Sequence, residues 1–567
     1  MKKYLFIALA ALGFAACTEK GEDNAPIQNA ELEESYIAIN LMAADVDSRA
    51  VTDDIGNADE YGYELGTEAE RKINSAYFFF FDENGNPFNV NGAPATAPGG
   101  NKNHMALTIS EATTSAMPNV SDIKEAVLVL KTYKGVYPSK IVAVLNWTPA
   151  DRAYSLAELH DVMADLNTNG SVMSNSVYMD GAGKVVDATP LTAANIKTSA
   201  EAATAAPIDI YVERIAAKVV VTGDSIYDTE KDTTPIVALG ESSKIDVYVK
   251  ILGWELYNDY STTNLLKDIN NWDVATLGLT WNDIPYYRCY WATSQNVNPM
   301  DSFSWSYENY TSKGFPTANG FNVASDASYT AGTYTYCGEN TTTDYRTKVI
   351  LKGQLMQKDG ENFEPIELAR WYGTEYAGNE ALRIAVANSI KYTLYYYDEV
   401  NSKYISVAPE DLQCVKGKDV DASAKSYEVG FQLSTVGKAK TWYKYDSEKG
   451  YVVMGDNAVA GDNTVKANAY LATVEPALLY AEGMTYYSVD IKHLGATGKT
   501  AEYGVVRNHV YQIDIESIKG YGSPVYSGLD FVVDQPEYPV EDEASYVAAR
   551  INVLSWKVVK QGVDIVQ

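Results

Sequence analysis

Apolar and polar residues alternate along much of the chain. In the segment 35–42, Ile37, Ile39 and Leu41 are separated by Ala38 and Asn40, which predicts a β-strand with one buried face. An aromatic run at 76–81 leads into an Asn-Gly pair, a combination typical of a turn between two strands. Further alternating segments lie at 127–132, 141–145, 208–212, 244–256, 348–356, 389–397, 427–433 and 505–515. We therefore predict an all-β fold, mainly β with a few short helices.

Helical spacing is sparse. Apolar residues over 152–166 predict one helix, with Asp151 as its N-cap, and 379–392 is the best later candidate. The pattern shows no internal repeat and predicts a domain boundary near residue 215. We expect an N-terminal β-rich domain at 50–215 and a larger C-terminal β-rich domain at 216–540.

The C-terminal tail, residues 541–567, is apolar and has the composition of a strand. It follows two prolines, Pro536 and Pro539, which predict an extended joint. An apolar strand at a terminus promotes aggregation unless something covers it. Either the tail folds back onto its own domain, or it pairs with a sheet of another molecule. The residues that would be buried in either case are Ile551, Val553, Leu554, Trp556, Val558, Val563 and Ile565.

The first 16 residues have the pattern of a signal peptide. Lys2 and Lys3 precede a short apolar run that ends in small residues before Cys17. This arrangement is typical of a bacterial lipoprotein signal, in which Cys17 becomes the lipidated N-terminus; an ordinary secretory signal beside a chance cysteine is the alternative. Residues 17–49 then contain an acidic tether and the strand at 35–42. Arg49 and Ala50 follow in a predicted loop, where a trypsin-like protease could cut.

Composition and charge exclude several classes of partner. The chain has 567 residues, with 75 acidic against 45 basic side chains and a net charge of −30. This balance argues against nucleic-acid binding, because phosphate contacts need clustered cations. No later segment reaches 18 uninterrupted apolar residues, so we expect membrane contact only through the lipid. The 44 tyrosines, against 13 phenylalanines, favour extracellular β-structure.

The chain lacks the motifs of common catalytic and metal sites. Its four histidines form no metal motif, and Cys289, Cys337 and Cys414 fit no metal or redox spacing, although two of them could form a disulfide. Neither a nucleophile elbow nor a phosphate-binding loop occurs. We therefore assign no catalytic residue, metal or cofactor and expect a protein that is not an enzyme. Exposed tyrosines and tryptophans could bind glycans by stacking, although packing within a sheet is the commoner role.

Taken together and in chain order, several segments resemble the minor-fimbrilin (Mfa-type) family, fimbrial shaft proteins of the type V pili of the Bacteroidales. The matching segments contain Cys17 and Arg49, and they continue through the aromatic strand to the terminal tail. They are the region around residue 17 and the segments 48–50, 78–85, 141–149, 212–218, 336–341, 506–511 and 553–558.

The resemblance implies two transthyretin-like β-sandwich domains in an outer-membrane lipoprotein precursor, exported through the periplasm. It implies cleavage after Arg49 by an Arg-specific protease, which would remove the strand containing Ile37, Ile39 and Leu41 and open a hydrophobic groove. The tail at 541–567 would be a donor strand that fills this groove in a neighbouring subunit. The implied partners are identical subunits together with accessory tip and anchor subunits. The mature protein would form a cell-surface fimbria that supports adhesion and biofilm formation.

Four alternatives are weighed at the level of sequence. A tip subunit is disfavoured because it needs no donor tail, whereas an anchor or accessory subunit that keeps its lipid is harder to separate from a shaft subunit. A monomeric surface lipoprotein that binds glycans would also carry the N-terminal signal. A secreted hydrolase is disfavoured by the missing motifs.

Overall fold

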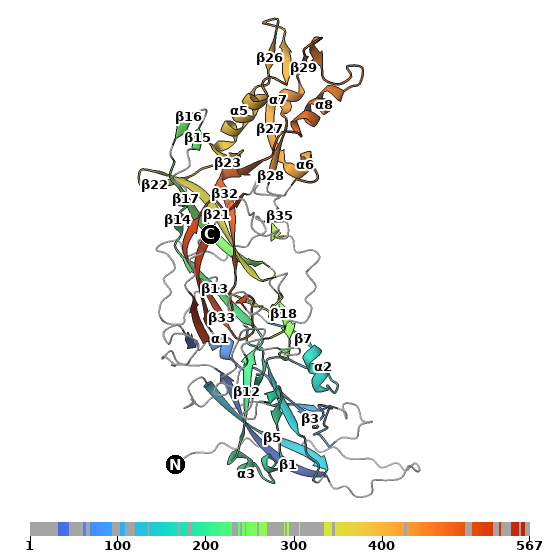
Figure 1. Ribbon diagram of the computed structural model, residues 1–567. Helices are drawn as coiled ribbons and strands as arrows, with labels where there is room; N and C mark the ends of the chain where they lie inside the picture. Colours follow the sequence, from blue (N-terminus) through green and yellow to red (C-terminus); the bar gives the residue numbers. More distant parts are fainter. Residues whose placement is uncertain are drawn as a thin grey trace.

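The computed structural model shows a chain built mainly of β-strands, which confirms the predicted all-β class. The strands form three packed regions stacked along an elongated molecule (Figure 1). The residues that the structure describes are 32–44, 61–63, 68–92, 102–107, 120–133, 135–166, 170–179, 184–229, 236–238, 241–243, 245–257, 260–268, 289, 292–293, 305–306, 334–342, 346–424, 428–493, 502–524, 532–533, 546–554 and 557–561.

The first sheet forms the N-terminal region, at the bottom of Figure 1. The aromatic run predicted at 76–81 is β3 of this sheet, and β11 (Thr189–Pro190) pairs with β6 beside the main path. The hydrogen-bonded order is β4 (His104–Leu107), β3 (Ala76–Phe81), β6 (Lys140–Leu145), β8 (Met173–Asn175), β12 (Ile208–Arg214), β1 (Leu32–Ala44) and β5 (Val120–Tyr133).

Both faces of β3 are covered, which explains its unbroken aromatic sequence. Phe78 and Phe80 belong to a core shared with β1, β5 and β12, so the two halves of the sheet face each other across this core. Phe79 and Phe81 point the other way, into a second core that includes Leu156 of α2 (Leu156–Asp161). A strand buried on both faces has no polar side to alternate with.

Two further sheets pack face to face as a β-sandwich in the middle of the molecule. Their facing strands, β13 and β33 on one side and β17 and β21 on the other, contribute to one core. The second sheet has the order β2 (Tyr61–Tyr63), β37 (Lys557–Gln561), β36 (Tyr546–Leu554), β33 (Val510–Lys519), β13 (Ala217–Gly223) and β20 (Tyr334–Cys337). The third has the order β14 (Ile226–Asp228), β17 (Val247–Tyr257), β21 (Lys348–Asp359), β32 (Met484–Asp490) and β34 (Ser523–Pro524), with β22 (Asn362–Pro365) also paired to β21.

Residues 366–482 form a third packed region, here called the distal module, at the top of Figure 1. It has its own core, to which Trp442, Phe431 and Leu382 contribute. The fourth sheet forms its base, in the order β16 (Glu241–Ser243), β15 (Ile236–Ala238), β24 (Thr374–Ala377), β23 (Leu368–Trp371), β31 (Ala477–Tyr480), β28 (Glu428–Leu433) and β27 (Leu412–Lys416). The fifth sheet forms its tip, in the order β26 (Lys403–Ser406), β25 (Tyr395–Asp398), β29 (Trp442–Asp446) and β30 (Gly450–Val453).

The remaining elements are short. Three two-stranded pairs are β9 (Tyr178–Met179) with β10 (Val185–Val186), β7 (Met163–Asp165) with β18 (Thr262–Asn264), and β19 (Trp305–Ser306) with β35 (Val532–Val533). The other α-helices are α1 (Glu68–Arg71), α3 (Ala200–Thr204), α5 (Gly378–Ile390), α6 (Gly417–Val420), α7 (Thr435–Lys438) and α8 (Asp462–Leu471). The 3-10 turns are η1 (Ala193–Asn195), η3 (Pro409–Asp411) and η4 (Ala481–Gly483). Within the described ranges, no helix has the length and apolar character needed to cross a bilayer.

The helix predicted at 379–392 is confirmed as α5, whereas the one predicted at 152–166 is too long. The structure begins α2 after Ser155, not Asp151, because the Ser155 hydroxyl accepts a bond from the Glu158 amide while the Glu158 carboxylate accepts one from the Ser155 amide. This reciprocal cap fixes the start of the helix. The helix ends before Val162, and the chain then enters β7.

Candidate functional site

The strand predicted at 35–42 lies in the interior of the first sheet, as β1. It pairs antiparallel with β5 along its whole length and parallel with β12 through residues 39–43 (Figure 1). Ile37 is fully buried in the shared core beside Leu128 and Leu130 of β5. For Ile39 and Leu41 the structure describes the backbone, which pairs with β5 and β12 on either side.

The strand β1 lies between β5 and β12 and supplies backbone partners to both. In the described part of the chain, β5 pairs with β1 and otherwise forms only a single bridge, between Lys131 and Asn91. Removal of β1 would leave the facing backbone groups of β5 and β12 without partners and would uncover Leu128 and Leu130. Unpaired backbone groups and exposed apolar side chains are both costly, so an empty slot would require another strand.

The C-terminal strands fold back onto their own domain in this structure. The strand β36 pairs antiparallel with β33, and β37 turns back along β36. Ile551 is paired with Ile513, Val553 with Tyr511, and Val558 of β37 with Leu554. This is the first of the two arrangements that the sequence left open for the tail.

A short strand near the predicted cleavage point closes the C-terminal hairpin. The strand β2 pairs antiparallel with β37, with Gly62 opposite Val558. The strand β2 begins 12 residues after Arg49 in sequence, so segments from both sides of the predicted cut take part in sheets: β1 in the first and β2 in the second. Several predicted residues lie outside the described residues, namely Cys17, Arg49, Ala50, Trp556, Val563 and Ile565.

A buried ion pair joins α1 to the sandwich. Glu70 and Lys218 are both fully buried, with 2.9 Å between the carboxylate and the ammonium group, and the Tyr336 hydroxyl donates a 2.5 Å hydrogen bond to Glu70. Burial disfavours the charged carboxylate, but Lys218, Arg214 and the Tyr336 hydrogen bond outweigh it and hold the pKa of Glu70 below its usual value. Burial and the adjacent carboxylate raise the pKa of Tyr336, which therefore stays a donor.

Two more buried ion pairs lie where the first sheet meets the sandwich. Lys267 pairs with Glu213 of β12 at 2.9 Å, and Arg507 pairs with Glu339 at 2.9 Å. Arg507 also donates to the carbonyl of Asn264, next to the first region. Buried charges of this kind need exact partners, so they fix the junction between the two regions.

These ion pairs were not predicted as functional, although the residues lie in segments that carry the family resemblance. The segment 212–218 contributes Glu213 and Lys218, and the segments 336–341 and 506–511 contribute Glu339 and Arg507. A usable signal exists in the sequence, because charged residues inside an otherwise apolar strand indicate burial with a partner. The partners themselves are distant in sequence and cannot be chosen by spacing.

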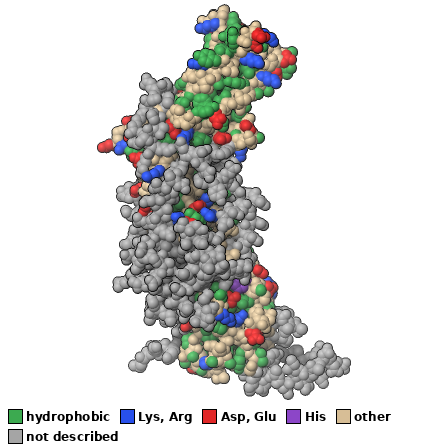
Figure 2. All heavy atoms as spheres, viewed as in Figure 1, with side chains coloured by type: hydrophobic (Ala, Val, Ile, Leu, Met, Phe, Trp, Pro, Cys, Tyr) green, Lys and Arg blue, Asp and Glu red, His purple; other side chains and the backbone are tan. Residues whose placement is uncertain are grey.

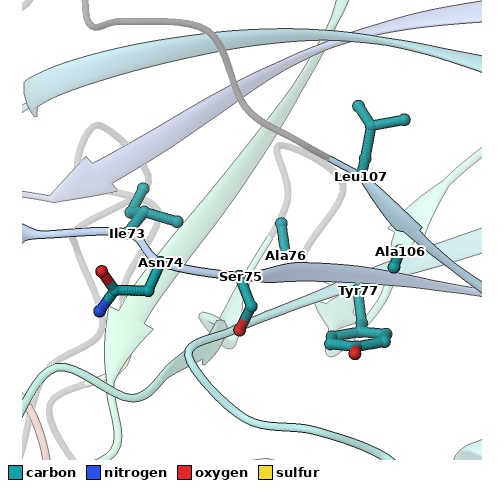
Figure 3. A pocket seen from close by; sticks show the side chains of 7 residues that line it. All are labelled: Ile73, Asn74, Ser75, Ala76, Tyr77, Ala106 and Leu107. Carbon is teal, nitrogen blue, oxygen red and sulfur yellow. The ribbon is translucent and has the colours of Figure 1, made fainter. Parts of the chain in front are cut away.

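A shallow pocket lies beside the starts of β3 and β4 (Figure 3). Its lining is aliphatic apart from an asparagine, a serine and a tyrosine: Ile73, Asn74, Ser75, Ala76, Tyr77, Ala106 and Leu107. These groups include no acid–base pair, and we assign no chemistry to them. Among the described residues, His, Cys, Asp and Glu side chains do not gather in threes as a metal site would require.

Comparison with known proteins places the C-terminal strands in a described family. Residues 478–562, which include β32, β33, β36 and β37, match the model for the C-terminal region of fimbrillin, the major fimbrial subunit protein type IV. The predicted resemblance to fimbrilins of the Bacteroidales is therefore confirmed. No curated protein sequence matches the chain.

Solved structures align along most of the chain at low similarity. A fimbrilin, FimA, from Porphyromonas gingivalis is 12% identical and has a TM-score of 0.32, with 92% of this chain and 98% of that chain covered. The tip fimbrial protein Mfa3 from the same organism, with a C-terminal truncation, is 12% identical with a TM-score of 0.24, covering 92% and 99%. A proposed cell adhesion protein from Parabacteroides distasonis is 12% identical with a TM-score of 0.32, covering 94% and 98%.

Proposed function

We propose that this chain is the major, shaft-forming subunit of a cell-surface fimbria and that it polymerises by donor-strand exchange. It is made as an outer-membrane lipoprotein precursor with its lipid on Cys17, and an Arg-specific protease cuts it after Arg49. The cut releases β1, and the C-terminal tail of a neighbouring subunit replaces that strand. The family match over residues 478–562 supports the fimbrial role, and the polymer supports adhesion and biofilm formation.

The observation that carries this proposal is the place of β1 between β5 and β12. A strand with two pairing neighbours and a fully buried Ile37 fills a slot that only another extended segment can fill. A strand from a partner supplies the same backbone hydrogen bonds and apolar side chains. Because the tail of one subunit enters a different surface of the next, the contact is heterologous and extends into an open filament.

The test compares two substitutions at the same position. The precursor, carrying Cys17→Ser so that no lipid is attached, is treated briefly with trypsin and run on a denaturing gel without boiling. We expect ladders from the wild type and from Arg49→Lys, because trypsin cuts after either residue. We expect a monomer from Arg49→Ala. An Arg-specific protease should process only the wild type.

Two outcomes would contradict the proposal. Ladders from Arg49→Ala that match those of the wild type would show that cleavage at this position is not required. Monomers from a fully cleaved wild type would show that loss of β1 does not open an acceptor slot. N-terminal sequencing of the surface-assembled protein should begin at Ala50.

The folded-back tail favours a second candidate, a monomeric surface lipoprotein. In that case β36 and β37 would simply complete the second sheet, as they do in this structure. Retention of residues 17–49 in the protein at the cell surface would support this candidate, and it would equally fit an anchor subunit that keeps its lipid. The N-terminal sequence therefore separates both from a shaft subunit.

A further inference from the structure

The fifth sheet, at the tip of the distal module, carries six tyrosines on one face. Within a strand they lie two residues apart, and each is directly paired with another of the six on a neighbouring strand. Directly paired residues of an antiparallel sheet point to the same side, so all six share one face. We call this the tyrosine face; it consists of Tyr395, Tyr397, Tyr404, Tyr443, Tyr445 and Tyr451.

Charged side chains of these strands are confined to the opposite face. There, Tyr396 and Trp442 contact each other as part of the module core. The alternation of the strands places four charged residues on that same side, which are Asp398, Lys403, Lys444 and Asp446. The tyrosine face is therefore uncharged along its strands in a protein with a net charge of −30.

The rings converge above the middle of the sheet. Tyr404 and Tyr451 come from the two edge strands, β26 and β30, yet their rings stack with centroids 3.9 Å apart and planes at 15°. Edge strands of a flat four-stranded sheet lie about 14 Å apart, so the face must curl inward. Three rings remain open to solvent, with exposed fractions of 57% for Tyr445, 41% for Tyr397 and 38% for Tyr451. Green side chains, a class that includes tyrosine, are visible on the distal module in Figure 2.

The hydroxyl groups distinguish these tyrosines from those that serve only the fold. Tyr227, Tyr480 and Tyr487 each donate a hydrogen bond to a backbone carbonyl in the interior. Within the part of the chain that the structure describes, none of the six hydroxyls on the tyrosine face bonds to a protein group. Exposed ring surface, chiefly that of Tyr445 and Tyr397, and these hydroxyls thus lie together on one face.

We propose that the tyrosine face binds a neutral oligosaccharide. A pyranose ring has an apolar C–H face, which packs on an aromatic ring, and a rim of hydroxyls, which bond to phenol oxygens. Tyrosine offers both with little conformational cost. An uncharged face fits an uncharged ligand, and along its strands it offers no cationic side chain to pair with the carboxylate or sulfate of an acidic glycan. The distal module lies at the opposite end of the molecule from β1, so this role does not depend on polymerisation (Figure 1).

The experiment uses the uncleaved, full-length precursor carrying Cys17→Ser on a printed array of neutral oligosaccharides and their sialylated and sulfated counterparts. Isothermal titration with the strongest neutral glycan then measures affinity. We expect the double variant Tyr445→Ser/Tyr451→Ser to bind about tenfold more weakly or not at all. Tyr445→Phe keeps the ring and its packing, so it should retain most of the affinity, whereas Tyr445→Ser alone should weaken binding; this pair tests the face even where the double variant folds poorly, because Tyr445 is exposed. Tyr372→Ser is the matched control, because Tyr372 is 71% exposed on the same module but lies outside the face.

The proposal is overturned if no neutral glycan binds, if only acidic glycans bind, or if the double variant binds as tightly as the wild type. It is also overturned if sedimentation shows a dimer that the double variant abolishes, because the face would then be an interface between two copies. Ladder formation after trypsin is measured on the same variants. Loss of glycan binding with intact ladders separates this proposal from the assembly mechanism.

Discussion

At the scale of single residues, burial decides which side chains hold β1 in its sheet. Ile37 is fully buried within β1, whereas Glu34 on the same strand is exposed and forms a 3.4 Å ion pair with Lys131 at the surface. Exposed ion pairs of this type contribute little to stability, because water and salt screen them. Ile37 and Glu34 therefore provide a buried and an exposed position on the same strand, β1, at which substitutions can be compared.

We expect Ile37→Asp to destabilise the uncleaved precursor by about 3 kcal/mol or more, since it removes a buried side chain and introduces a buried charge. Glu34→Gln should change the free energy of unfolding by less than about 1 kcal/mol. Urea denaturation of the Cys17→Ser precursors measures both. Once cut after Arg49, the two variants should polymerise like the wild type, because neither substitution remains in the chain. Equal stability of Ile37→Asp and wild type would contradict the placement of this side chain.

Glu70 gives a prediction that depends on pH. Its folded pKa is lowered from 4.5, so the stabilisation from ionised Glu70 is present above the ordinary carboxyl pKa and is lost as pH falls through the lowered value. Glu70→Gln should cost about 3–5 kcal/mol near neutral pH, because it removes the carboxylate beside buried Lys218. The difference from wild type should shrink in acid. Thermal unfolding between pH 7 and pH 3 tests this, with exposed Glu361→Gln as the control, and a difference that does not change with pH would refute it.

At the scale of secondary-structure elements, alternation located most of the strands but not their partners. The segment 389–397 is only partly a strand, because α5 continues to Ile390 and β25 begins at Tyr395. The segment at 35–42 was predicted as a strand from Ile37, Ile39 and Leu41, yet nothing in that pattern identifies β5 and β12 as its neighbours. Pairing depends on contacts between residues far apart in sequence, whereas periodicity is a local property. For the helix α2, a local signal was present in the sequence. The capping box of Ser155 and Glu158 fixes the start of the helix, and Asp151, the predicted N-cap, is not the capping residue.

The C-terminal hairpin yields a prediction at this scale. Deletion of residues 546–567 removes β36 and β37, which form one edge of the second sheet with β2. We expect the truncated and trypsin-cut protein to accept the tail of an intact subunit and then to terminate the filament, because it can receive a strand but cannot donate one. Mixing it with intact protein should shorten the ladders in proportion to its share. Ladders from the truncated protein alone would show that the donor lies elsewhere.

At the scale of the whole molecule, the elements of the proposed assembly mechanism and the tyrosine face occupy different regions. The strand β1 is in the first sheet, the C-terminal hairpin is in the second, and the tyrosine face is in the fifth. The sequence predicted the all-β class and both terminal strands. It did not predict that the hydrophobic residues of 216–540 divide between the sandwich core and a separate core built around Trp442. Composition and spacing cannot reveal such a division, because both cores draw on the same residue types.

The connection of the distal module to the rest of the chain has a further consequence. The strands β23 and β31, through which the chain enters and leaves it, are adjacent and antiparallel, with Arg370 opposite Leu478. The end of β23 at Trp371 and the start of β31 at Ala477 therefore lie side by side. A two-residue Asn-Gly turn would be enough to join them into a β-hairpin. Residues 372–476 are therefore a long insertion at the position of a single tight turn. Beyond β24, which pairs with β15, such an insertion can lengthen or shorten without shifting β1 or the C-terminal hairpin, so the exposed tip and the elements of the proposed assembly mechanism are free to diverge at different rates.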